Sequence, residues 1–213
     1  MSASDWAAVA LSLRVALAAT GLSLVPGVAL GWALARGRLR FAFVWEHAAL
    51  LPLVLPPVVT GYALLLALPR TVAFTWVAGV LAGAVVGFPL LVQASRIAFE
   101  AADPEVEEAA RADGASGWQV LTRVTLPLAG PGIAAGAALH FARALGEFGA
   151  TVVVAGSIPF QTRTLPLALY ARLHEAGGEG PALRLAGVAV ALSVVCLGLY
   201  ALLVRRLRSV SRR

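Results

Sequence analysis

The sequence predicts an all-α membrane protein, a polytopic bundle of about five transmembrane helices with one polar helical insert. The chain has 213 residues, of which 60% are hydrophobic and only 13% are charged, whereas a soluble domain carries roughly 25% charged residues. Uncharged runs of about 20 residues, the length with which an α-helix crosses a bilayer, recur along the chain. They cover residues 15–35, 48–69, 71–95, 124–142 and 185–204. The short alternating segments typical of a membrane β-barrel do not occur.

The arginines predict how these runs are oriented. The first run is too long for a cleaved signal peptide and follows the acidic Asp5, so we expect a retained helix. Three arginines follow it, and five follow the last run: Arg36, Arg38 and Arg40, then Arg205, Arg206, Arg208, Arg212 and Arg213. Because basic residues are enriched on the cytoplasmic side, we expect the N-terminus outside, the C-terminus in the cytoplasm and five crossings. Because the sequence shows no linker, we expect residues 1–213 to form a single transmembrane domain.

The region 143–184 does not fit a simple loop. Two pieces of it, FGATVVVAGSIP and TLPLALYARL, are apolar, but each is too short to span a bilayer. Broken segments are tolerated at membrane depth where protein or a water-filled cavity covers their backbone. We therefore expect 143–157 to contain the end of the fourth helix and a bend, and 164–175 to form a short helix that dips toward the bilayer from outside.

The polar insert, about residues 103–123, is predicted to be two short helices joined at a glycine corner. Asp103 followed by Pro104 is a helix start, and Gly114 is placed to end that helix in a left-handed conformation. The Ser-x-x-Gln spacing from Ser116 opens a second helix, expected to run through Arg123. Residues 100–113 hold six acids and one arginine. An anionic membrane surface would repel that charge, so we expect a protein partner.

Composition also excludes several functions. All 17 basic residues are arginines, so the chain lacks the lysine of a P-loop and is not itself a P-loop ATPase. A net charge of +6 would indicate nucleic acid in a soluble protein, but these arginines flank membrane runs. An intramembrane protease, the remote alternative, needs His-Glu-x-x-His or a serine beside a histidine base, and Glu46-His47 is reversed and isolated. We therefore expect no catalytic residues, no metal and no cofactor.

One motif in the insert resembles a known family. Its residues are Glu108, Ala109 and Ala110, then Gly114 after three further residues, and Val124, Leu126 and Pro127 after nine more. This spacing, with Val124 where the family usually has Ile, resembles the EAA loop of type I ABC-importer permeases. The resemblance implies the fold of those permeases, with the insert as a coupling helix docked on a separate ABC ATPase subunit. It further implies two ATPase copies and a second permease copy. The small-residue stripe Gly79, Gly83, Gly87 would permit close helix approach.

Two longer stretches narrow the resemblance. Residues 51–68 and 141–170 look like the molybdate-transport permeases of the bacterial inner membrane, and the sulfate and tungstate permeases share their Gly-Glu-Phe-Gly core. This similarity implies that the chain forms the translocation pathway for molybdate, supplied by an extracytoplasmic oxyanion-binding protein. Sulfate or thiosulfate and tungstate are the alternative substrates.

Charged and hydroxyl residues in the apolar stretches are the candidates for the pathway. Glu147 stands four residues after Arg143, so the two share a helix face and can form an ion pair. That pair either fixes the bend at Gly146 and Gly149 or acts as a gate. A carboxylate is unsuited to binding an anion, so contact with a passing oxyanion is expected from a cluster at the outer mouth, namely Thr151, Thr162, Arg163 and Thr164. We expect Arg14 to extend outward from its helix, and His140 to be a packed polar residue.

Overall fold

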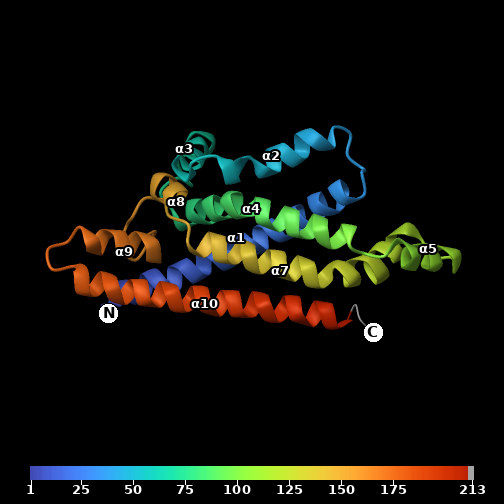
Figure 1. The fold of residues 1–213 in the computed structure, drawn as a ribbon. Helices are drawn as coiled ribbons and strands as arrows, with labels where there is room; N and C mark the ends of the chain where they lie inside the picture. Colours follow the sequence, from blue (N-terminus) through green and yellow to red (C-terminus); the bar gives the residue numbers. More distant parts are fainter. Residues whose placement is uncertain (211–213) are drawn as a thin grey trace.

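The computed structural model describes residues 1–210, and every regular element in that range is a helix (Figure 1). The predicted all-α class is therefore confirmed. Within residues 1–210, four helical segments are long and apolar enough to cross a membrane: Ala3–Ala35, Trp76–Glu100, Gly117–Leu145 and Glu179–Leu202. The first two are α1 and α4, and the last lies within α10 (Glu179–Val210). Arg212 and Arg213, used above to orient the chain, lie outside the described residues.

The predicted second run, 48–69, is not one helix. It is divided into α2 (Ala42–Val54) and α3 (Pro57–Ala67), whose axes are bent by 114°. The break falls at Leu55, which has an extended backbone, because the proline after it excludes the α conformation and supplies no N–H. A fifth span is reached only if this bent pair counts as one.

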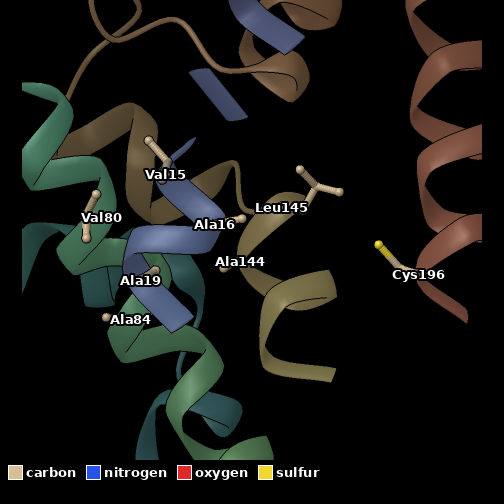
Figure 2. Packing of buried hydrophobic residues seen from close by; sticks show 8 residues of the cluster. All are labelled: Val15, Ala16, Ala19, Val80, Ala84, Ala144, Leu145 and Cys196. Carbon is tan, nitrogen blue, oxygen red and sulfur yellow. The ribbon is translucent and has the colours of Figure 1, made fainter. Parts of the chain in front are cut away.

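The core lies where α1, α4 and α7 (Leu126–Leu145) pack along one another. Small side chains fill it, and Figure 2 shows them meeting between these helices while Cys196 approaches from α10. A Cβ on Gly83 would lie 3.2 Å from Ala144 Cβ and 3.3 Å from Ala19 Cβ. The glycine stripe therefore serves packing within this chain, so it gives no support to an interface with a second copy.

A buried histidine joins the same three helices. His140 on α7 is fully buried, with Nδ1 3.1 Å from the Thr20 hydroxyl and Nε2 3.4 Å from the Ala84 carbonyl oxygen. Its ring lies against Gly87, where an added Cβ would be 2.8 Å from His140 Cδ2. The expectation of a packed polar residue is confirmed.

The broken region contains the predicted bend after α7 and a short helix within 164–175, together with a further short helix that was not predicted. After α7 ends, α8 (Gly149–Val154) and α9 (Leu165–Leu173) are short helices at the end of the bundle that is opposite the insert (Figure 1). Arg172, at the end of α9, donates to the buried Asp5 of α1 over 2.9 Å. This hydrogen bond, reinforced by one to Glu175, raises the pKa of Arg172. The pair fixes α9 against the first turn of α1.

Candidate functional site

The polar insert has the predicted helix, glycine corner and helix. Helix α5 (Pro104–Ala112) begins with the Asp103 carboxylate, which accepts from the Glu105 N–H over 2.9 Å. Gly114 follows with φ +87°, the left-handed conformation that a helix stop requires. The second helix, α6 (Gly117–Val120), opens with a reciprocal capping box between Ser116 and Gln119. The local start and stop signals thus determine this part of the chain.

The end of the second helix differs from the prediction. It does not stop at Arg123, because a π-helical turn, η1 (Leu121–Thr125), joins α6 directly to α7. In this turn the Leu126 N–H bonds to the Leu121 carbonyl, one residue further back than in an α-helix. Pro127 follows at the second position of α7 and has no N–H with which to continue the regular ladder. Leu126 and Pro127 are therefore the first turn of a spanning helix, rigidly continuous with the insert.

The outer surface of the insert is left uncovered by this chain. Glu108, Ala109 and Gly114 are exposed, and Ala110 is half-buried. Beside them the Val106 and Trp118 side chains are also exposed, Trp118 to 72%. We call Val106, Glu108, Ala109, Gly114 and Trp118 the insert surface. It carries one carboxylate together with apolar and aromatic side chains, and aromatic residues are enriched at protein interfaces.

Beneath this surface lies a residue that sequence reasoning missed. Glu107 is only 4% exposed, and its carboxylate accepts hydrogen bonds from Arg36, Arg111 and Thr125. A polar cavity of about 340 Å³ adjoins it, between the insert and the end of α1. The spacing of Glu107 and Arg111 could have revealed half of this cluster, since residues four apart share a helix face. The other half comes from the far end of α1.

The predicted ion pair at the α7–α8 break is present. Arg143 Nη1 lies 2.6 Å from Glu147 Oε2, and the Glu147 side chain is 2% exposed. The second carboxylate oxygen accepts from the Ala150 N–H over 2.8 Å, which caps the first turn of α8. A buried carboxylate that holds two donors in this way fixes the bend between the two helices.

The structure brings together only part of the predicted cluster at the outer mouth. Arg163 donates to the side chain and carbonyl of Ser157, at 3.1 and 3.2 Å, and Thr162 Oγ1 accepts from the Ile158 N–H at 3.0 Å. Both residues therefore hold the loop between α8 and α9. Thr151 and Thr164 are buried, and the Thr164 hydroxyl has no partner within the described residues.

A cavity of about 880 Å³ opens at this same end of the bundle. Thr162 is the one member of the predicted cluster that lines it, whereas Arg143, Glu147, Thr151, Arg163 and Thr164 are not among its lining residues. Its cationic side chain is Arg14, which is exposed, as expected for a side chain that extends outward from its helix. Aromatic residues complete the wall, namely Phe74, Trp76 and Phe160. The sequence did not reveal that Arg14 lines this cavity, because the segments that form the cavity wall are far apart in the chain.

Across residues 1–210, no group of three or more His, Cys, Asp or Glu side chains is arranged to hold a metal ion.

The described residues form an all-helical bundle with a helical insert ahead of a long apolar helix. The chain belongs to the family of binding-protein-dependent transport system inner membrane components, which matches residues 27–209. Among its relatives, the molybdenum transport system permease protein ModB of Escherichia coli (strain K12) is 44% identical over 207 residues, covering 91% of this chain and 90% of the relative. ModB of Haemophilus influenzae is 40% identical over 215 residues, covering 94% of each.

The fold is shared with a solved ABC transporter. A chain of the MetNI methionine ABC transporter, in inward-facing conformations, superposes with a TM-score of 0.75 at 17% identity and 94% coverage of both chains. At this identity the likeness establishes the fold. The family model and the molybdenum permease relatives confirm the family recognised from the insert motif, and the long apolar helices agree with a multi-pass membrane protein.

Proposed function

We propose that the chain is the transmembrane permease subunit of an ATP-driven importer, forms the pathway for molybdate and couples to a separate ATPase subunit. The observation that carries the proposal is the insert surface, which carries Glu108, Ala109 and Gly114 of the EAA spacing and remains uncovered at one end of the bundle. The 44% identity to a molybdenum permease over nine-tenths of the chain supports the substrate.

A coupled motor is physically required for such a substrate. With the cell interior negative, moving a dianion inward costs about 4.6 kcal/mol per 100 mV, at roughly 2.3 kcal/mol for each charge. Passive flow would therefore not accumulate molybdate. An ATPase docked on the insert surface supplies the energy, and the continuous helix from α6 through η1 into α7 offers a rigid route from that surface into the membrane.

The remaining partners follow from the same assignment. The insert lies in the cytoplasm, the N-terminus outside, and an extracytoplasmic oxyanion-binding protein delivers the anion to the opposite end. There the cavity lined by Arg14 and Thr162 offers a weakly cationic mouth, suited to an anion that must also be released. A second copy of this chain and two ATPase copies complete the importer. The chain itself acts as one transmembrane domain over 1–213.

Two roles are proposed for the residues at the broken region. The Arg143–Glu147 pair holds the bend between α7 and α8 and works as a gate element if that bend changes during transport. Thr151, Thr162, Arg163 and Thr164 line the outer mouth once the loop between α8 and α9 moves. In the conformation described, Arg163 is occupied by Ser157.

The test is reconstitution of the permease with its ATPase and a matched binding protein for each of four anions: molybdate, tungstate, sulfate and phosphate. We expect molybdate to stimulate ATP hydrolysis most, tungstate next because it is nearly the same size, and phosphate not at all. The control is the same ATPase without permease. Stimulation by phosphate or an uncharged solute, with none by molybdate, contradicts the assignment.

A further inference from the structure

The carboxylate of Glu107 is the meeting point of three segments that are far apart in the chain. Glu107 lies on α5, one position before the exposed Glu108, but unlike Glu108 it is buried in the protein. Arg36, which donates to it through Nη2, is the residue that ends α1. Thr125, which donates to it over 2.8 Å, is the last residue of η1.

The π-helical turn is what brings Thr125 to this carboxylate. A π turn is rare and occurs frequently at functional sites. Here it separates the insert from α7, and the Thr125 side chain is fully buried against Glu107. The turn therefore links α5 to the first turn of a spanning helix through a single hydrogen bond.

The charges around Glu107 hold α5 in one position. Arg36 and Arg111 both pair with it, and Arg111 Nη2 lies 3.0 Å from Glu107 Oε2. Charge-assisted hydrogen bonds of this kind are stronger and more directional than neutral ones. Arg38 and Glu108 line the adjoining cavity and add one charge of each sign. A displacement of α5 therefore requires either breaking the Arg36 contact or moving the end of α1.

We propose that Glu107 is a positioning residue that joins the coupling helix α5 to the inner ends of α1 and α7, so that a displacement of α5 moves both spanning helices together. The inference rests on the proposed coupling to an ATPase. It differs from the role of the EAA residues themselves, since Glu108 faces the partner whereas Glu107 transmits the partner's movement into the bundle.

The first experiment measures coupling in the reconstituted transporter. Glu107→Gln removes the charge but keeps an oxygen that accepts from Thr125, and Arg36→Gln removes the other side of the contact. In each variant we expect unchanged ATPase binding and a ratio of substrate-stimulated to basal ATP hydrolysis that falls about fivefold, the lower end of coupling between two sites. In the double variant this ratio should fall no further than in either single variant, because both changes break the same contact.

Milder and matched variants keep the test decisive. Thr125→Val changes one buried hydroxyl to a methyl group and should lower the same ratio to a smaller extent. Glu105→Gln removes an exposed carboxylate from the same helix and should leave the ratio at the wild-type value. The proposal is overturned if Glu107→Gln keeps the wild-type ratio. It is also overturned if the fold-reductions of the ratio in Arg36→Gln and Glu107→Gln multiply in the double variant.

A second measurement is independent of the ATPase. In the permease alone, Glu107→Gln should speed amide hydrogen exchange in α5, whereas Glu105→Gln should not. Equal exchange in α5 of the wild type and Glu107→Gln contradicts the inference. If the wild-type permease shows no substrate-stimulated hydrolysis, the proposed function fails, and the exchange result still decides whether Glu107 anchors α5.

Discussion

Buried carboxylates mark the points where one segment of this permease is fixed to another. Glu147 binds Arg143 and the first turn of α8, while Asp5 binds Arg172 of α9. Each acid is almost completely buried and holds at least two donors. Removing one partner from a buried ion pair is costly, because the remaining charge is left without compensation.

The Arg143–Glu147 pair gives a prediction about stability. Arg143→Ala leaves the Glu147 carboxylate buried with only the Ala150 N–H, so the variant should lose about 3–5 kcal/mol and melt at least about 6 °C below the wild type. Thermal unfolding in detergent checks it, with the exposed Arg184→Ala as the control. Equal melting of Arg143→Ala and the wild type would show that the pair does not hold the bend.

A second residue-scale prediction concerns the glycine corner of the insert. Gly114→Val places a β-branched side chain at φ +87°, where such residues are strongly disfavoured, and Glu108→Lys reverses a charge on the insert surface. Both variants should insert into the membrane but bind the ATPase more weakly. Gly117→Val is the control, because an added Cβ there meets open space. Normal substrate-stimulated hydrolysis by both test variants would rule out the assigned docking surface.

Helix packing in this bundle depends on small residues more than on large apolar ones. Alanines and glycines of α1, α4 and α7 let the three backbones approach closely, as membrane helices commonly do. His140 then supplies polar contacts to the Thr20 hydroxyl and the Ala84 carbonyl across the same interface. The close approach of α4 to α7 therefore includes a tight steric fit around the His140 ring.

That fit predicts the effect of filling the space at Gly87. In Gly87→Val the new Cβ lies 2.8 Å from the His140 ring, and overpacking of this kind costs about 1–3 kcal/mol. We expect a lower melting temperature, whereas Gly21→Val, which faces open space, should melt close to the wild type. The fall in melting temperature caused by Gly87→Val should be smaller when it is measured in a His140→Ala background. An undiminished loss in that double variant argues against the steric explanation.

The sequence predicts those elements whose signals are local. Neighbouring residues predict the start of α5, its end at Gly114 and the capping box at Ser116. They also predict the ion pair between Arg143 and Glu147, which are four residues apart. The bend between α2 and α3 was missed although Pro56-Pro57 is present, because the apolar run continues through it. Glu107 was missed for another reason: its partner Arg36 is 71 positions away, so only the tertiary fold brings them together.

At the scale of the whole molecule, one permease chain leaves large apolar faces without a partner. Only 6% of the most apolar window of α10 is buried within the chain, and α3 exposes Val58, Tyr62 and Leu66. Lipid covers part of this area, and a second copy is proposed to cover the rest. We propose that a pathway for the anion forms between the two copies.

The proposed assembly predicts two permease copies in each complex. Native mass measurement of the purified transporter should give two permease and two ATPase subunits. Cross-linking through a cysteine at Val190, which is exposed on α10, in a Cys196→Ala background should yield a permease dimer. A complex with one permease copy contradicts the assembly. A dimer that forms only through another face excludes α10 as the contact between the copies but leaves the two-copy assembly standing.

Uptake into proteoliposomes tests whether this chain carries molybdate inward by means of an ATPase docked on the insert surface. The vesicles contain the permease, its ATPase and ATP on the insert side, with molybdate and its binding protein on the other. We expect molybdate to accumulate above its external concentration, and we expect this accumulation to disappear without the ATPase and to be strongly reduced in Glu108→Lys. Equal molybdate entry with and without the ATPase, or accumulation of phosphate in place of molybdate, would contradict this expectation.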